Sequence, residues 1–284
     1  MIKKSNMVAF VAARNEDGLK LQDFLAARLA VSRRSAKNLL DERVVWVNRR
    51  CIWMAHHVVK TGDTVEVPSW PDTKKKAEQK IRVLVECGEY LVVDKPAGIV
   101  VVGKEGVEAK LRAQLNAPEL VAVHRIDKDT TGCLLFARNN NAFEAAVKLF
   151  KTRRVIKLYQ AIVFGKFEQR ASLLNQELDG KRAVSQVNRL SCNKDASFLK
   201  IRIETGRTHQ IRRHLAAVRH PILGDTQYGI KTVRDPRYQS VPRPMLHSCN
   251  IELPNPLEQS QTIKAHSPLP ADFRRCLSLF GMGR

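Results

Sequence analysis

The N-terminal region carries apolar residues at the spacing of two short helices, followed by two short strand patterns. The first helical face consists of Leu21, Phe24, Leu25 and Leu29. Ser32 can cap a second helix, in which the cations Arg33, Arg34 and Lys37 alternate with the apolar Ala36, Leu39 and Leu40. Residues 44–47 and 64–67 have the composition of strands. The pattern predicts an N-terminal tail at residues 1–14 and a small α+β module at residues 15–68.

A polar segment separates this module from the rest of the chain. Residues 69–80 contain three consecutive lysines and almost no apolar side chains, so we expect a linker there. Beyond it, strand patterns occupy residues 81–85, 90–94, 134–137 and 199–203, and helical spacing occupies residues 143–150 and 211–218. Strands and helices do not alternate strictly. We therefore expect an α+β domain at residues 81–284, built on a mostly antiparallel sheet.

The charge balance is the first indication of function. Of 284 residues, 49 are Lys or Arg and 28 are Asp or Glu, which gives a formal net charge of +21. Such an excess favours a polyanionic partner, either nucleic acid or an anionic membrane. The apolar run at residues 7–13 is short for a signal peptide, and no later stretch approaches the about 20 apolar residues of a membrane-spanning helix. We therefore expect a nucleic-acid partner, no membrane, and a cytoplasmic location.

Cysteine and histidine spacing indicates neither disulfides nor a metal site. The six cysteines are spread over the chain without a C-x-x-C pair, which favours small buried side chains in a reducing compartment. His209 and His214 are five positions apart, so they would lie on different faces of a helix. No bound metal is expected.

Two stretches concentrate side chains that could carry chemistry. Residues 123–132 place Asp127 beside cations, which favour an ionised carboxylate, and end in a tight polar turn before a predicted buried strand. A plain exposed loop would explain the same pattern, so both interpretations stay open. Residues 204–214 turn at Gly206 into a helix, and the N-terminus of that helix, with Arg207 and Thr208 beside it, is suited to bind an anion such as phosphate.

The same stretches resemble a known enzyme family. H-R-I-D-K-D-T-T-G at residues 124–132 resembles the H-R-L-D-x-x-T-S-G signature of the RluA-like RNA pseudouridine synthases. Residues 90–98, 157–161, 205–213, 220–225 and 246–247 resemble further segments of this family, so the resemblance spans residues 81–272. Ile126 and Thr131 replace the Leu and Ser of the signature, and neither change removes a reactive group.

This resemblance implies an activity and assigns roles to particular residues. The family isomerises uridine in RNA to pseudouridine, without redox chemistry and without a cofactor. Asp127 is implied to be the essential carboxylate, which could attack the base, attack the sugar or remove a ribose proton. Tyr159 is implied to lie against the base. Arg212 is implied to pair with Asp127, with Arg207 as the competitor for that pairing. Implied substrate-binding residues are His124, Arg125, Thr131, Arg207 and His209.

The N-terminal module is similar to the S-four-type RNA-binding domain. Its segments L-x-x-F-L, S-R-R-x-A-K and V-x-V-N carry this similarity, whereas Arg43 and Arg49 stand where that family usually has glycine. The similarity implies RNA contacts for Arg33, Arg34 and Lys37, and a merely solvated basic helix is the alternative. We therefore expect a monomer that modifies structured RNA, ribosomal rather than transfer RNA. A non-catalytic RNA-binding protein and a DNA-binding protein remain as alternatives.

Overall fold

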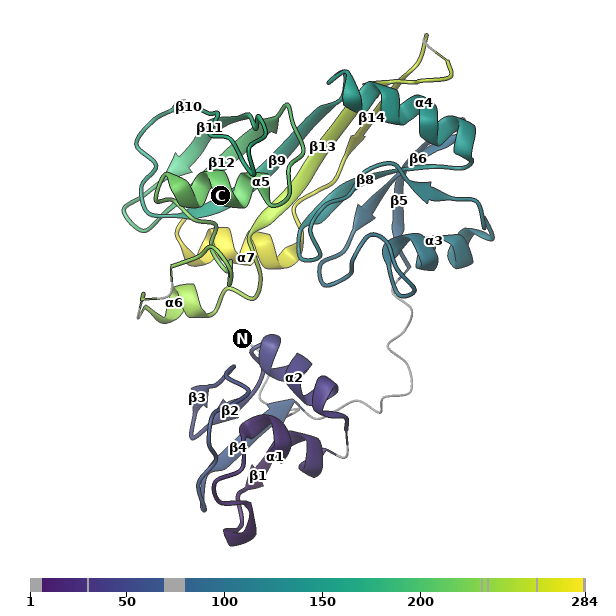
Figure 1. Ribbon diagram of the computed structural model, residues 1–284. Coiled ribbons are helices and arrows are strands. Elements are labelled where there is room, and N and C mark those ends of the chain that lie inside the picture. The colour runs from purple at the N-terminus through teal and green to yellow at the C-terminus, as the bar shows by residue number, and fades with distance from the viewer. Residues whose placement is uncertain are drawn as a thin grey trace. The chain divides into compact units, whose positions relative to one another are not determined.

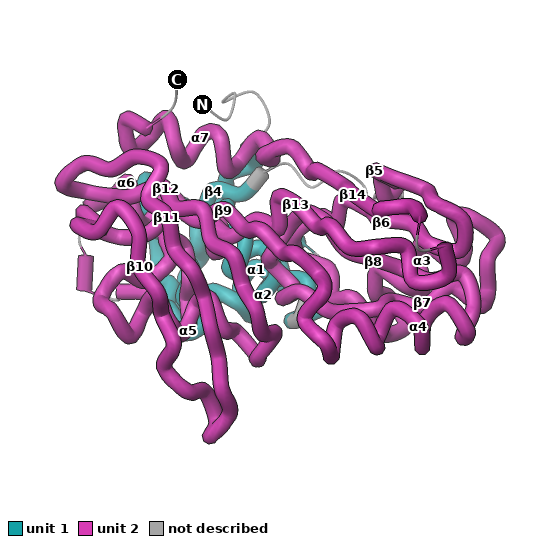
Figure 2. Tube along the Cα trace, turned by 90° about the horizontal axis from the view of Figure 1, so that it is seen from above, with its two compact units in different colours: residues 1–79 teal, residues 80–284 magenta. Residues whose placement is uncertain are grey.

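The computed structural model consists of two compact units, residues 1–79 and residues 80–284, which Figure 2 distinguishes by colour. It describes residues 7–29, 31–68, 80–230, 232–233, 235–258 and 260–282. The expected linker at residues 69–80 lies, apart from Lys80, outside the described residues.

Two helices and a four-stranded sheet make up the first unit (Figure 1). The helices are α1 (Leu21–Arg28) and α2 (Arg33–Asp41), preceded by a short 3-10 turn at Arg14–Glu16. The sheet has the order β1 (Met7–Val11), β4 (Thr64–Pro68), β2 (Trp46–Val47) and β3 (Arg50–Cys51). The hydroxyl of Ser32 accepts a hydrogen bond from the backbone amide of Ser35 at 3.1 Å, which confirms the predicted cap of α2.

The beginning of this unit differs from the expected tail at residues 1–14. Residues 7–11 form β1, which pairs antiparallel with β4 from Met7 opposite Pro68 to Val11 opposite Thr64. This strand was hard to predict because its partner is more than 50 positions away and its side chains do not alternate cleanly between apolar and polar. Phe10 packs against the apolar core of the unit, so the unit begins at least at β1.

The second unit is built on a ten-stranded sheet in the order β10-β11-β12-β9-β13-β8-β6-β5, with β14 beside β13 and β7 beside β8. Among the described strand pairs, only β13 and β8 run parallel. The mostly antiparallel sheet is therefore confirmed. Its strands are β5 (Arg82–Cys87), β6 (Tyr90–Lys95), β7 (Val121–Ala122), β8 (Thr131–Ala137), β9 (Ile156–Phe164), β10 (Ala171–Leu174), β11 (Ser185–Cys192), β12 (Ala196–Ile203), β13 (Leu246–Pro254) and β14 (Thr262–His266).

Helices cover both faces of this sheet. They are α3 (Val107–Leu115), α4 (Asn140–Lys151), α5 (Gln210–Ala217), α6 (Pro236–Gln239) and α7 (Ala271–Leu279). Alternate residues of β6 divide between two apolar clusters, one shared with α3 and the other with α4. Figure 2 shows α7 on the face opposite α5, and Phe198 of β12 contacts Phe273 of α7. No helix within the described residues is long and apolar enough to cross a membrane.

A glycine makes the parallel contact at the centre of the sheet possible. Gly132 has φ +106°, and a Cβ at this position would lie 2.1 Å from the backbone oxygen of Ser248. A larger residue there would push β8 away from β13. The close approach fixes where β8 begins, and with it the position of the loop at residues 123–130 that leads into β8.

Candidate active site

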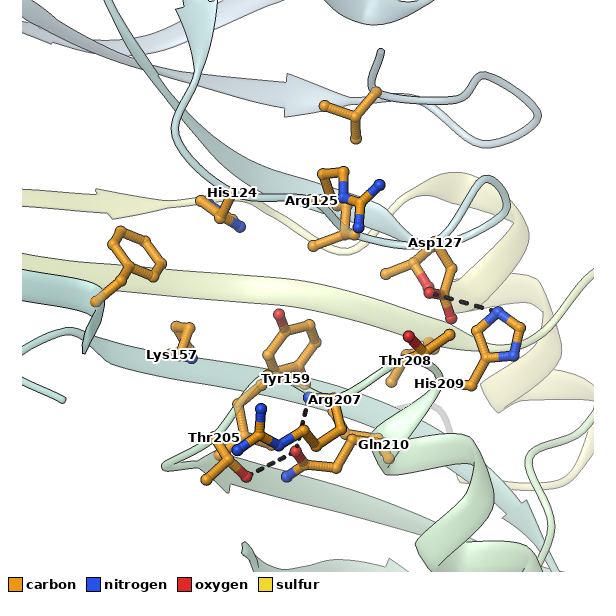
Figure 3. A pocket seen from close by; sticks show the side chains of 18 of the residues that line it. His124, Arg125, Asp127, Lys157, Tyr159, Thr205, Arg207, Thr208, His209 and Gln210 are labelled. Carbon is orange, nitrogen blue, oxygen red and sulfur yellow. Dashed lines mark hydrogen bonds and ion pairs between the residues drawn. The ribbon is translucent and has the colours of Figure 1, made fainter. Parts of the chain in front are cut away.

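A pocket of about 870 Å³ opens over the middle of the large sheet. Three segments far apart in the sequence supply most of its polar lining: the loop at residues 123–130, strand β9, and the turn from the end of β12 into α5. Residues 100–102, the end of α4 and Leu246 complete the lining. Figure 3 shows side chains from all three segments pointing toward one another. The two polar stretches that the sequence singled out therefore face each other across one pocket.

Asp127 lies at this pocket with two nitrogen groups beside its carboxylate. Arg212 donates from Nη1 to Oδ2 at 3.2 Å, and Nε2 of His209 lies 3.9 Å from Oδ1 (Figure 3). The Asp127 side chain is 28% exposed, so substrate can reach it. The predicted pairing of Asp127 with Arg212 is confirmed as a contact.

Arg212 is held from its other side by a carboxylate that the sequence analysis did not single out. Its Nε and Nη2 donate to Asp225 at 2.6 and 2.9 Å, and the side chain of Asp225 is fully buried. Burial alone raises the pKa of Asp225, but the hydrogen bonds from Arg212 and from two backbone amides outweigh it, so the pKa is lowered. Asp225 stays ionised and fixes the guanidinium, which leaves Nη1 to point at Asp127. Asp225 ends the family-like segment at residues 220–225, the one signal in the sequence that could have found it.

Tyr159 contributes the aromatic face of the pocket. It belongs to β9, and only 6% of its surface is exposed, although its ring lines the cavity (Figure 3). Burial raises the pKa of its phenol, so the hydroxyl keeps its proton over the physiological range. A flat, neutral ring beside Asp127 is suited to stack against a planar base.

The buried side chain of Gln210 holds the turn before α5 through hydrogen bonds. Its Oε1 accepts hydrogen bonds from the Thr205 hydroxyl at 2.7 Å and from the backbone amide of Arg207 at 3.1 Å. Arg207 itself is exposed and donates from Nε to the backbone oxygen of Arg182 at 3.2 Å. Arg207 thus lines the pocket without pairing with Asp127, which separates the two arginines that the sequence left in competition.

Three of the four remaining predicted substrate residues line the pocket. His124 stacks on Phe150 with ring centroids 5.1 Å apart, and its Nε2 accepts from the backbone amide of Leu135. Burial and the charge of Lys157 lower the pKa of His124 to about 3, so the ring is neutral. Arg125 is exposed at the rim, and His209 bonds through Nδ1 to the hydroxyl of Tyr228 at 3.1 Å.

Thr131 is the exception among the predicted substrate residues. Its side chain is buried in β8, and Oγ1 lies 2.9 Å from Nδ1 of His247. Thr131 is not among the residues that line the pocket. It is better described as a link between β8 and β13, since the polar turn of the signature ends inside the sheet rather than at the substrate.

The buried Lys95 was also missed by the sequence analysis. Its Nζ donates to the backbone oxygens of Pro96 and Lys128 at 2.8 and 2.7 Å, and burial lowers its pKa to about 7. Because Lys128 follows Asp127 directly, this lysine ties the loop that carries Asp127 to the end of β6. A lone lysine within the family-like segment at residues 90–98 was the available signal.

The cations of the first unit are arranged differently. Arg33 is largely exposed and lies 2.7 Å from Asp23, and Lys37 is exposed on the same helix, α2. Arg34 is also part of α2, but its side chain lies outside what the structure describes.

Within the described residues, no cluster of three or more His, Cys, Asp or Glu side chains could hold a metal ion.

Comparison with known proteins gives one consistent family. The model of the RNA pseudouridylate synthase family matches residues 89–217. The ribosomal large subunit pseudouridine synthase D of Pseudomonas aeruginosa is 32% identical over 72% of this chain and 73% of its own length. The protein of the same name from Nitrosomonas europaea is 30% identical over 97% and 88%, respectively.

The fold has solved counterparts as well. The human RNA pseudouridylate synthase domain containing 4 superimposes with a TM-score of 0.59 at 24% identity, over 70% of this chain and 92% of that one. Among the sequence relatives, the ribosomal large subunit pseudouridine synthase C of Vibrio cholerae is 29% identical over 92% of this chain and 93% of its own length. The family model covers most of the residues that line the pocket, and the relatives that match 92% and 97% of this chain extend over both units.

Proposed function

This chain belongs to the RNA pseudouridylate synthase family, and we propose that it converts specific uridines of large-subunit ribosomal RNA to pseudouridine. The observation that carries the proposal is the Asp127 carboxylate, held by Arg212 beside the ring of Tyr159 in an accessible pocket. The three bacterial relatives described above are named ribosomal large subunit pseudouridine synthases, which supports ribosomal RNA as the substrate. The net charge of +21 supports a large polyanionic partner.

The reaction is an isomerisation within one nucleotide. The bond from ribose carbon 1′ to N1 of uracil breaks, a bond from the same ribose carbon to carbon 5 forms, carbon 5 loses its proton and N1 gains one. Asp127 supplies the reactive carboxylate, and Arg212 orients it through the hydrogen bond from Nη1 to Oδ2. Tyr159 stacks on the base and holds it while it is detached.

The target base must leave its stack to reach Asp127, because the reacting atoms are covered in a paired helix. Flipping costs a few kcal/mol, less in loops and bulges. Arg125, exposed at the rim, is suited to fill the space that the base vacates. Arg207 and His209 bind the neighbouring backbone, and neutral His124 shapes the cavity wall.

The proposal extends to the first unit and to the setting of the reaction. Residues 15–68 act as an S-four-like RNA-binding module, in which α2 presents Arg33, Arg34 and Lys37 to phosphates. The enzyme works as a monomer in the cytoplasm and without a cofactor. The residues in the pocket supply the base, cation and stacking surface that the isomerisation requires.

Mapping of pseudouridines in ribosomal RNA tests this function directly. RNA from cells with and without the gene is compared, and the gene is then restored either intact or as Asp127→Asn. We expect at least one position of large-subunit RNA to lose its pseudouridine without the gene and to regain it only with the intact form. Turnover by purified Asp127→Asn should fall by at least about 1000-fold, while RNA affinity changes only a few fold.

Two other outcomes have clear meanings. If a transfer RNA position changes instead, the activity stands and the substrate class is wrong. If no pseudouridine changes in any RNA, and the purified protein forms none on ribosomal RNA, the proposed function fails.

A further inference from the structure

Lys157 is a cation inside the pocket that the proposed reaction has not yet used. It lies on β9 two positions before Tyr159, so both side chains leave the same face of the strand about 7 Å apart. Both line the pocket, and Figure 3 shows them side by side. A ligand that stacks on Tyr159 is therefore within reach of the Lys157 ammonium.

Within the described residues, Lys157 has no hydrogen-bond acceptor and no carboxylate partner. Its Nζ lies 5.7 Å from the ring centroid of Phe150 and would be 3.9 Å from a Cβ on Gly206. Glu204 follows Ile203, the residue that pairs with Lys157 on β12, and its carboxylate is engaged with Gln186 and Arg182. Burial lowers the pKa of Lys157 to about 8. An ammonium in these surroundings lacks the acceptors that normally accompany a half-buried charge.

The strand register, together with Figure 3, indicates that Lys157 and Asp127 lie on opposite sides of Tyr159. Thr131, which follows Asp127 by four positions, lies beside His247, and His247 pairs with Gln160 of β9. Lys157 pairs instead with Ile251, farther along β13. Figure 3 agrees, with Lys157 on one side of Tyr159 and Asp127 on the other. A base over Tyr159 thus has one edge toward Asp127 and the opposite edge toward Lys157.

The chemistry of uracil identifies those edges. N1 and carbon 5, the atoms that exchange the ribose bond, flank carbon 6 and must face Asp127. The two carbonyl oxygens flank N3 on the opposite edge, which must face Lys157. We infer that the Lys157 ammonium donates a hydrogen bond to a carbonyl oxygen of the target uracil; this inference rests on the proposed function.

This contact fits each of the three roles that Asp127 could play. Addition to the base, or loss of the base from ribose, leaves an electron pair on the uracil, and the negative charge spreads to its carbonyl oxygens. A half-turn of the detached base about the axis through carbon 6 and N3 exchanges N1 with carbon 5 and one carbonyl with the other. An ammonium on the carbonyl edge therefore binds the base equally well before and after the turn.

The same contact discriminates between bases. Cytosine carries an amino group in place of the carbonyl at carbon 4, and an ammonium cannot accept a hydrogen bond from it. Lys157 then favours uracil over cytosine at the stage when the flipped base enters the pocket.

Paired RNA fragments and paired variants test the assignment. The probes are synthetic fragments of large-subunit ribosomal RNA that differ only at the target position, which carries either uridine or pyrimidin-2-one riboside, a nucleoside that lacks the carbonyl at carbon 4. Turnover is measured on the uridine fragment, and affinity is measured for both fragments over a range of salt. The variants are Lys157→Met, Lys157→Arg and, as a matched control, Lys151→Met, which removes an exposed cation that lines the same pocket.

We expect Lys157→Met to lose about 10- to 100-fold in turnover at saturation and to abolish the preference for the uridine fragment, with the salt slope unchanged. Lys157→Arg should recover part of the turnover and part of the preference for the uridine fragment. Lys151→Met should lower the affinity for both fragments alike, with a salt slope lower by about one. A Lys157→Met variant that melts like the wild type yet behaves like Lys151→Met would overturn the inference in favour of a phosphate contact. Unchanged turnover would overturn any substrate contact. Absence of pseudouridine with the wild-type protein is a failure of the proposed function instead, and the affinity comparison still tests Lys157.

Discussion

The two units use the same kinds of charged side chain in opposite ways. In the first, Arg33 lies 2.7 Å from Asp23 with 77% of its side chain exposed. In the second, Arg212 lies 3.2 Å from Asp127 and is only 10% exposed. The short distance of the exposed pair adds little, because water and salt screen such a pair to about 1 kcal/mol or less. Exposure, rather than distance, therefore decides what a cation can do here.

Exposed and buried cations are therefore suited to bind RNA in different ways. Exposed cations attract any polyanion, act almost independently, and lose strength as salt rises. A buried cation has one orientation and a defined partner, so it can control the charge and position of a reacting group. The first unit is thus suited to concentrate RNA, and the second is suited to act on one nucleotide.

Among the variants that test this comparison, we expect the largest effect from Arg212→Met, on the buried side. Without the guanidinium, the Asp127 carboxylate loses the donor 3.2 Å away that orients it and the positive charge beside it. We expect turnover at saturation to fall by about 100-fold or more, with affinity much less affected. Pseudouridine formation under single-turnover conditions checks this.

Arg207→Met is the matched control for that variant, since Arg207 lines the same pocket but is exposed. It should weaken RNA binding and lower the salt slope by about one, with turnover at saturation nearly unchanged. If the loss of turnover at saturation appears with Arg207→Met and the salt effect with Arg212→Met, the two assignments must be exchanged.

Among these variants, Asp225→Asn should produce the next largest effect, and it separates a buried ion pair from an exposed one with the same number of hydrogen bonds. Asp225 holds Arg212 through two hydrogen bonds in the core, while Asp179 holds Arg213 through two hydrogen bonds at the surface. We expect Asp225→Asn to reduce the free energy of unfolding by up to about 3 kcal/mol and turnover by about 10-fold. Asp179→Asn should change stability and turnover little. If Asp225→Asn and Asp179→Asn lost equal amounts of stability and turnover, burial would not be what distinguishes the two ion pairs.

Asp225 should also make the free energy of unfolding depend on pH, in a direction that follows from its lowered pKa. The folded-state pKa of Asp225 is lowered from 3.8, so its contribution to stability is complete above that value and is lost as pH falls through the lower folded pKa. Acid unfolding of the wild type should therefore steepen below pH 3.8, and Asp225→Asn should lack part of this steepening. Chemical unfolding at several acidic pH values measures the difference.

The sequence predicted the local parts of the site better than the contacts between them. The segment around Asp127 and the helix that carries Arg212 were recognisable because each is a short run with its own composition. The pairing of the two was inferred from family resemblance. Nothing in local composition states that residues 85 positions apart meet, since that contact depends on how β8, β9 and β13 align.

Contacts between distant segments also explain why the sequence misassigned one residue and overlooked two others. Thr131 looked like part of the reactive loop, but β8 begins at that residue and turns its side chain toward His247. Asp225 and Lys157 each look ordinary in the sequence. Only the fold shows that Asp225 has a buried arginine as partner, and that the Lys157 ammonium has no acceptor among the described residues. Side chains defined by contacts distant in the chain need the register of the sheet before their roles can be assigned.

The smallest expected effect belongs to the exposed helix of the first unit, in the double variant Arg33→Met and Lys37→Met. Both side chains are exposed on α2, so their loss should leave stability nearly unchanged and remove two phosphate contacts if this helix binds RNA. The salt slope for a large ribosomal RNA should then fall by about two, with a several-fold loss of affinity at moderate salt. Turnover of a short fragment at saturation should stay at the wild-type value, because the short fragment reaches the pocket without this helix. A salt slope identical to that of the wild type would assign α2 to solvent and move the RNA contacts of this unit to another face. A loss of turnover on the short fragment would mean that the first unit also takes part in the reaction, and the division of labour between exposed and buried cations would no longer hold.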